Sequence, residues 1–326
     1  KIIKEKEGVT VDYDKTVEQL YTYVTEKWNK KANIKLTATT TVSKPKYTTE
    51  DCEKVSNEPM GSYTTEFSVG SSYANRNLNI QNGAKLINGA VVDPGEQYSC
   101  NENLYPWTED NGWHPAGTYV DGGVQDSLGG GICQVSSTLY NALLRAEIKV
   151  VKRFPHSMAV GYVPLSADAA LAGDYKDLVF ENDTDAPIYV QGIYNSGGSI
   201  TFNIYGHDTR KAGHSVKYES KTVKTTPVKT QTKKDSSKPV GYSEVESSGH
   251  VGYVAELWKI TYENGKQVSK ELIHTSTYAM SPTIVVKGTK KASTTTKKDD
   301  SDKDDKKSSE KTTKKSTSSK KSKKSE

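Results

Sequence analysis

One cysteine in a glycine-rich run is the residue of this chain best placed for covalent chemistry. Cys133 follows three glycines, Gly129–Gly131, and the residues after it have the pattern of a helix. A helix N-terminus carries partial positive charge and unpaired N–H groups, which favour a thiolate and can hold an oxyanion. The glycines let a substrate approach the backbone. The run predicts a cysteine nucleophile; the alternative is a small buried hydrophobic residue after a tight turn.

A cysteine nucleophile needs a base, and His156 is the candidate among six histidines. It lies beyond the helix expected after Cys133, where the chain returns toward the start of that helix, and Pro155 fixes the backbone before it. Its alternative role is that of a structural histidine. A third group should orient the imidazole. Asp168 is the first candidate and Asp177 the second, although an Asp in a turn is more often a cap.

Other residues near Cys133 are candidates for binding substrate. We expect the N–H groups of Gly131, Ile132 and Cys133 to hold the oxyanion of an acyl transfer. Ser136 lies one helical turn from Cys133 and could touch substrate or be a hydroxyl on the helix surface. Arg153 could bind a substrate carboxylate or form a surface ion pair. No Cys or His cluster has zinc-ligand spacing, so we expect no metal and no cofactor.

The cellular compartment is indicated by composition. The chain is rich in Thr and Ser and has 20 Tyr and few Cys, as in exported proteins. Cys52 and Cys100 could pair in an oxidising compartment, or both could stay unpaired. No run approaches the roughly 18 apolar residues of a membrane span. Because the chain starts at Lys1 without a Met or a signal peptide, we expect a fragment of a longer protein, with room for a membrane anchor upstream.

The spacing of apolar residues predicts the elements that position these groups. The helix that begins at Cys133 and ends near Glu147 has one apolar face, made of Val135, Leu139, Leu143 and Ala146. Further helices are expected over residues 9–31 and 75–90, and a short one around Cys52. Strands are expected at 34–39, 62–67, 150–154, 159–163, 178–180, 188–193 and 200–205.

Two regions of the chain are rich in turn-forming and polar residues and lack the periodic apolar pattern. Residues 101–131 are predicted to be rich in loops, and Trp107 and Trp113 there could stack on a glycan or anchor packing. Residues 207–246 are polar and carry long Thr and Lys runs. A β hairpin follows, with strands at 253–262 and 268–278, and a last strand at 283–286.

The positive net charge of the chain belongs to its tail. Residues 291–326 hold 13 Lys against 7 Asp and Glu, a net +6, which leaves the rest of the chain at −1. Because this segment has Ala292 as its one apolar residue, it is expected to be disordered. It would be a solvated spacer or, alternatively, bind an anionic wall polymer. The body lacks a basic stripe with interleaved aromatics, which excludes nucleic acid as a partner.

Residues 60–206 carry an ordered set of motifs that resembles the VanW family, named for an accessory gene of glycopeptide-resistance clusters. The dozen-residue block around Cys133 is the most specific. The blocks are Thr64–Phe67, Asn75–Arg76, Asn79–Ile80, Pro94–Glu96, Ser99, Gly130–Asn141, Arg153, His156–Ser157, Tyr162–Pro164, Asp168–Ala169, Asp177–Leu178, Phe180 and Asn182. Two positions depart from the family pattern. Ser166 stands where Gly is usual, so the loop carrying Asp168 is expected to differ locally, and Cys100 stands where an aromatic is common, which favours a disulfide with Cys52.

Neighbouring segments resemble other wall-associated domains. Residues 1–58 resemble the end of a peptidoglycan-binding domain. Residues 215–289 resemble the G5 module, named for five glycines, here Gly241, Gly249, Gly252, Gly265 and Gly288. The expected organisation is a peptidoglycan-binding-like part at 1–58, a VanW-like catalytic domain at 59–207, a linker and G5-like module at 208–289, and a tail at 290–326. The fold class is α+β, with a small all-β module after a mixed core domain.

The resemblance implies cell-wall chemistry outside the cytoplasm, in a Gram-positive envelope. It implies an L,D-transpeptidase that joins two diaminopimelate residues of peptidoglycan stem peptides through an acyl-enzyme on Cys133. His156 would be its base, a role that His114, which lies outside the family pattern, would not fill. Two alternatives stay open: a cysteine endopeptidase or carboxypeptidase on the same polymer, and a non-enzymatic wall-binding protein.

Overall fold

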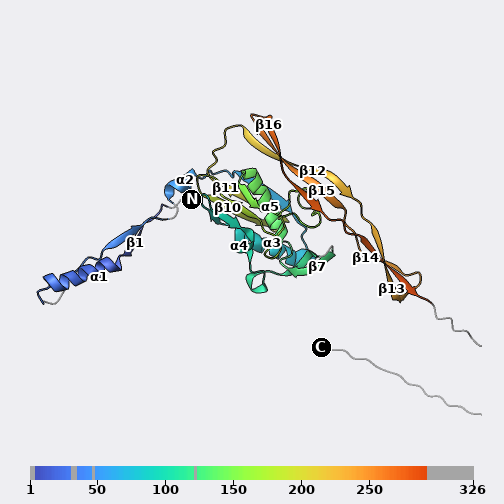
Figure 1. Cartoon of the computed structure of the whole chain (residues 1–326), viewed down its shortest axis with the longest axis horizontal. Coiled ribbons are helices and arrows are strands. Elements are labelled where there is room, and N and C mark those ends of the chain that lie inside the picture. The colour runs from blue at the N-terminus through green and yellow to red at the C-terminus, as the bar shows by residue number, and fades with distance from the viewer. Residues whose placement is uncertain (1–3, 31–34, 46–47, 121–122, 292–326) are drawn as a thin grey trace, which may run out of the picture.

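The computed structural model describes residues 4–30, 35–45, 48–120 and 123–291. A small N-terminal segment, a central body and a long β-rich module follow one another along the longest axis (Figure 1). The tail predicted to be disordered lies, from residue 292 on, outside the described residues. Within the described part, no helix is long and apolar enough to cross a membrane. Helices and sheets share the chain and an all-β module follows the body, so the α+β prediction is confirmed.

The N-terminal segment is a two-stranded ribbon with one helix. Strand β1 (Gly8–Val11) pairs antiparallel with β2 (Thr40–Ser43). Between them, α1 (Tyr13–Thr22) is capped by Asp12 and continues as a π-helical turn, so the predicted helix over 9–31 starts later and ends earlier. The strand predicted at 34–39 is displaced to β2; residue 34 lies outside the described residues. Helix α2 (Thr49–Lys54) forms as predicted around Cys52.

The body is built on a four-stranded antiparallel sheet in the order β3-β11-β10-β4. Alternate residues Ile200, Phe202 and Ile204 of β11 are fully buried, which gives the sheet one apolar face. Two helices cover this face, α5 over β3 and β11, and α3 over β10. The bounds are Gly61–Glu66 (β3), Ala74–Ile87 (α3), Ala90–Val92 (β4), Ile132–Ala146 (α5), Ile188–Asn195 (β10) and Ser199–Tyr205 (β11).

The start of α5 depends on glycine. Gly131 has a φ of 109°, and a Cβ there would lie 3.1 Å from the carbonyl oxygen of Arg76. A Cβ on Gly130 would lie 2.5 Å from the carbonyl oxygen of Ala116. A side chain at either position would therefore push the helix start away from α3 and the neighbouring hairpin. The helix ends in a left-handed residue, Glu147.

Smaller elements surround the start of α5. A second sheet has the order β5-β9-β8, and a hairpin of β6 and β7 lies within the region predicted to be loops. The strand predicted at 159–163 does not form, because residues 153–178 run as a long irregular connection between β8 and β9, with Gly161 and Pro164 in it. The bounds are Gln97–Ser99 (β5), Cys100–Leu104 (α4), Pro115–Val120 (β6), Gly123–Leu128 (β7), Lys149–Lys152 (β8) and Val179–Glu181 (β9).

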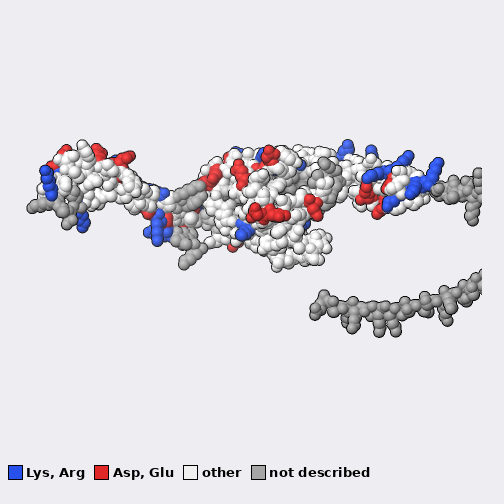
Figure 2. Space-filling view, turned by 90° about the horizontal axis from the view of Figure 1, so that it is seen from below, with Lys and Arg blue, Asp and Glu red and all other residues white. Residues whose placement is uncertain are grey.

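The C-terminal β module consists of two three-stranded sheets, ordered β12-β15-β16 and β13-β17-β14. Residues 207–246, for which the apolar pattern predicted no strand, form three strands whose polar side chains mostly face solvent. The predicted hairpin is β15–β16. Figure 2 shows Lys and Arg gathered beside acidic groups at the far end of this module. The bounds are His214–Thr226 (β12), Thr230–Pro239 (β13), Ser243–Ser247 (β14), Gly252–Glu263 (β15), Lys266–Tyr278 (β16) and Thr283–Lys290 (β17).

Candidate active site

Cys133 is the second residue of α5 and is half-buried. The backbone N–H of Leu171, on the irregular connection, lies 3.4 Å from its Sγ, and the carbonyl oxygen of Leu171 lies at the same distance. The N–H of Ile132, expected to bind an oxyanion, already donates to the carbonyl oxygen of Gly129 at 3.0 Å. The amides of Gly131 and Cys133 are therefore the better candidates for oxyanion donors.

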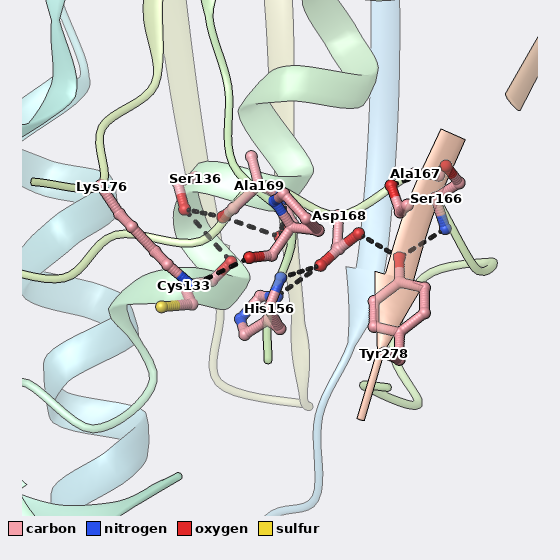
Figure 3. Close-up of polar contacts among 12 residues, drawn as sticks. Cys133, Ser136, His156, Ser166, Ala167, Asp168, Ala169, Lys176 and Tyr278 are labelled. Atoms are coloured by element: carbon pink, nitrogen blue, oxygen red, sulfur yellow. Dashed lines mark hydrogen bonds and ion pairs between the residues drawn. The ribbon is translucent and has the colours of Figure 1, made fainter. Parts of the chain in front are cut away.

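His156 is a buried histidine held by Asp168. The Nδ1 of His156 lies 2.6 Å from Oδ2 of Asp168, and its backbone N–H donates to the same oxygen at 2.7 Å. The hydroxyl of Tyr162 lies 3.3 Å from Nε2. The imidazole also lies close enough to Cys133 for each group to shift the pKa of the other. The structure thus brings together the cysteine, the histidine and the first-choice aspartate of the sequence analysis (Figure 3).

Asp168 is buried, with 1% of its side chain exposed, and its carboxylate is surrounded by donors. Besides His156 at Oδ2, Oδ1 accepts hydrogen bonds from Arg153 Nη2 at 2.6 Å and from the Tyr278 hydroxyl at 2.5 Å. A buried carboxylate is stable only with such partners. Each oxygen is held in place, which fixes the plane of the carboxylate and with it the His156 ring.

The charges of the three groups support one another. Burial raises the pKa of Cys133, but the nearby His156 and the backbone N–H of Leu171 outweigh this effect, so that the thiol pKa is lowered overall. Burial lowers the pKa of His156, but Asp168 and Cys133 raise it to about 9. The pKa of Asp168, raised by burial, falls to about 2 because of His156 and Arg153. The lowered pKa of the thiol and the raised pKa of the imidazole both favour a thiolate–imidazolium pair over the neutral pair.

The polar face of α5 clamps the segment that carries Asp168. The hydroxyl of Ser137 accepts from the N–H of Ala169 at 2.9 Å and donates to its carbonyl oxygen at 3.2 Å, and Ser136 donates to the same oxygen at 2.7 Å. Asn141 Nδ2 donates to the carbonyl oxygen of Ala167 at 2.6 Å. Ser136, Ser137 and Asn141 are buried although they are polar and stand among the apolar residues of α5. Polar residues in such a helix were the sequence feature from which the clamp could have been predicted.

Several predicted roles do not fit the positions observed. Ser136 is fully buried in this clamp, so it is neither a substrate contact nor a surface hydroxyl. Arg153 is buried against Asp168, so it neither faces substrate nor lies in a surface ion pair. Asp177 binds Ser99 Oγ at 2.7 Å and holds the first turn of α4. Trp113 is fully buried and donates to the carbonyl oxygen of Leu104, as a packing anchor does.

The remaining expectations concern Trp107, the cysteines and Ser166. Trp107 is partly buried and packs on the hydrophobic core. The expected disulfide does not form, because Cys52 is exposed, Cys100 is buried and both are free thiols. Ser166, which replaces a usual glycine, has a φ of 68°, in the left-handed region that favours glycine. Its hydroxyl lies 2.8 Å from that of Ser276 in the β module.

Two other residues near the thiol were missed from the sequence. Lys176 Nζ donates to the carbonyl oxygen of Pro155 at 3.1 Å, which ties the residue before His156 to the end of the irregular connection (Figure 3). Gln134, next to Cys133, accepts from Arg76 Nη2 at 2.7 Å and donates to the hydroxyl of Thr65 at 2.9 Å. It therefore anchors the start of α5 to both α3 and β3.

Comparisons with known proteins match two parts of the chain. Residues 75–205 match the family described as VanW like protein, and residues 217–290 match the G5 domain. The segment at 1–58 lies outside both matches, so its assignment stays a prediction.

Individual relatives cover about half of the chain or less. The uncharacterised protein YoaR of Bacillus subtilis is 37% identical over 164 residues, which are 50% of this chain and 53% of YoaR. The vancomycin B-type resistance protein VanW of Enterococcus faecalis is 28% identical over 34% of this chain and 42% of its own length. The chain thus spans about half the length of these relatives. A solved IgA1 protease G5 domain is 30% identical over 25% of this chain and 96% of its own, with a TM-score of 0.19.

Proposed function

The chain carries a VanW-like domain followed by a G5 domain, and from this premise we propose that it is a cell-wall L,D-transpeptidase that works through an acyl-enzyme on Cys133. The observation that carries the proposal is the buried Asp168–His156 pair beside the partly buried thiol of Cys133 at a helix N-terminus. The two domain matches support a wall-associated, extracellular protein. The identity of the donor and acceptor stem peptides is to be determined by experiment.

The first half-reaction forms a thioester. The Cys133 thiolate attacks the carbonyl carbon of the diaminopimelate residue in a donor tetrapeptide, and the amides of Gly131 and Cys133 stabilise the oxyanion. The peptide bond to the terminal D-Ala then breaks. The His156 imidazolium gives its proton to the leaving amine. A neutral imidazole and an acyl-enzyme remain.

The second half-reaction restores the enzyme. The side-chain amine of diaminopimelate in an acceptor stem attacks the thioester, and His156 takes a proton from this amine. The carbon–sulfur bond breaks, which returns the thiolate and leaves a peptide bond between the two stems. Asp168 stays ionised throughout, because Arg153 and His156 stabilise its charge.

Water in place of the acceptor amine would make the protein a carboxypeptidase, and the products decide between the two. The experiment is incubation with purified muropeptides followed by mass spectrometry, with Cys133→Ala as the inactive variant and Cys52→Ala as the matched control at an exposed thiol. Crosslinked dimers that require Cys133 support transpeptidation. Shortened monomers alone indicate hydrolysis, and unchanged muropeptides with folded protein would indicate a wall-binding protein without this activity.

A wall-polymer partner is proposed for the β module. Its far sheet presents three lysines in β13 and two in β17 against Asp235 and two glutamates of β14. This sheet lies at the end of the molecule away from the body (Figure 1), where it can contact an anionic polymer without covering Cys133.

A further inference from the structure

A strand of the β module reaches the buried carboxylate of the candidate site. Tyr278, the last residue of β16, is 3% exposed. Its hydroxyl donates to Oδ1 of Asp168 at 2.5 Å and accepts the backbone N–H of Ser166 at 2.6 Å. Figure 3 shows the tyrosine on its strand, on the side of Asp168 opposite His156. The two residues are 110 positions apart in the chain.

Two more residues on the same face of β16 reinforce this contact. Ser276 Oγ accepts from Arg153 Nη1 at 2.8 Å, and Arg153 in turn binds Asp168. His274 Nδ1 lies 3.1 Å from the hydroxyl of Ser166. Residues 274, 276 and 278 alternate along a strand, so they face the same side. One edge of the module thus lies against the Asp168 loop at three successive positions.

We propose that Tyr278 is a positioning residue of the catalytic site, so that the VanW-like and G5 domains together form one catalytic unit. The inference rests on the proposed function and extends it to a residue of the second domain. Oδ1 of Asp168 is shared by Tyr278 and Arg153, which leaves Oδ2 directed at His156. The tyrosine thereby sets both the orientation of the carboxylate and how much of its charge acts on the imidazole.

The chemistry of Tyr278 suits this role. Burial and the charge of Asp168 raise the pKa of its hydroxyl, so it stays protonated and donates over the whole working range of the site. Hydrogen bonds to a charged acceptor are worth more than those between neutral groups. A donor on one carboxylate oxygen also withdraws charge from the other, which weakens its hold on the imidazolium proton.

The test compares Tyr278→Phe with Tyr218→Phe in a Cys52→Ala background. Tyr218 is a matched control, because its hydroxyl also joins the module to the body, at the carbonyl oxygen of Leu144 at 2.7 Å, but away from Asp168. The first readout is the pH dependence of Cys133 alkylation by iodoacetamide, which needs no wall substrate. The second is the rate of crosslinking of muropeptides.

We expect the inflection at which His156 loses its proton to move upward by about half a pH unit in Tyr278→Phe, because more of the Asp168 charge then acts on the imidazole. The crosslinking kcat should fall roughly tenfold at an unchanged KM, since the ring is less firmly oriented. Tyr218→Phe should match the parent protein in both readouts.

Coincident alkylation profiles of Tyr278→Phe and the parent would overturn the inference, and so would an equal shift in Tyr218→Phe, which would assign the effect to domain docking. If Tyr278→Phe does not fold, Ser276→Ala decides instead, because it removes the contacts of Ser276 with Arg153 and Ser166 but leaves Tyr278 on Asp168, and it should move the same inflection by less. A parent protein that makes no crosslinks would overturn the proposed function, while the alkylation profile would still test Tyr278.

Discussion

The pairing of Cys133 with His156 determines the range of pH in which the site can act. The lowered pKa of the thiol and the pKa of about 9 of the imidazole place the thiolate–imidazolium state between the two. Both charged forms are needed, one to attack and the other to protonate the leaving amine.

The crosslinking rate should therefore follow a bell-shaped pH profile. It rises as Cys133 ionises, below the ordinary thiol range, and it falls as His156 loses its proton near pH 9. Initial rates measured across pH with a muropeptide donor check this. A rate that keeps rising above pH 9 would show that the neutral imidazole is the active form.

Replacement of His156 should make the Cys133 thiol less reactive. In His156→Gln, burial acts on Cys133 without the opposing imidazolium, so its pKa should rise and alkylation at pH 7 should slow by at least about tenfold. Peptide-resolved mass spectrometry after iodoacetamide treatment measures this. Exposed Cys52 in the same molecule is the internal standard and should label equally in both proteins. Undiminished labelling of Cys133 would remove His156 from the proposed pair.

At the scale of elements, α5 supports the site on two sides. Its apolar face packs on the sheet, while its buried hydroxyls hold the segment with Asp168. The sequence predicted the first role from periodicity. It did not predict the second, because a buried hydroxyl and an exposed one look alike until the partner segment is in place.

Ser137→Ala should destabilise the protein by about 1–3 kcal/mol, because the buried N–H of Ala169 loses its acceptor. Urea unfolding measures the change in the free energy of unfolding. The matched control is Ser62→Ala, whose exposed hydroxyl contacts Asn203 and should matter by less than about 0.5 kcal/mol. Equal effects of the two substitutions would contradict the clamp.

How far sequence patterns predicted these elements depended on burial. Strands β10 and β11 and helices α3 and α5 each bury one face, and the apolar pattern predicted them. Strands β12, β13 and β14 were not predicted, since their Thr- and Lys-rich side chains are mostly exposed and main-chain pairing with β15 and β17 holds them. Cys133, His156 and Asp168 lie within one stretch of chain and could be chosen together. No pattern links Tyr278 to them, because its contact depends on how two domains pack.

At the scale of the whole molecule, a second cluster joins the β module to the body. His214 of β12 places Nε2 at 2.7 Å from Glu147, which ends α5, and Nδ1 at 2.8 Å from Glu263 of β15. Lys259 and Arg210 also contact Glu147. Since both ring nitrogens face carboxylates, the imidazole binds both best when it is protonated.

This contact should make domain docking sensitive to pH. Hydrogen bonds with Glu263 and Glu147 raise the pKa of His214, so its contribution is fully present below the ordinary histidine pKa and is lost as pH rises through the raised value. Thermal unfolding of His214→Gln should consequently show less loss of Tm between pH 6 and pH 9 than the unaltered protein. Identical losses in the two proteins would rule out this histidine as the sensor.

The contact of β16 with Asp168 also bears on how this protein can be divided. A cut between residues 205 and 217, where the two matched domains meet, would remove Tyr278 and Ser276 and leave Oδ1 of Asp168 with Arg153 and water. A recombinant VanW-like fragment would then keep the cysteine, the histidine and the aspartate. It would lose some of the side chains that shield the aspartate from solvent. If the G5 domain were exchanged for another, the site would lose the same contacts unless the new domain placed a tyrosine beside Asp168. The two domains are therefore expected to change together in evolution.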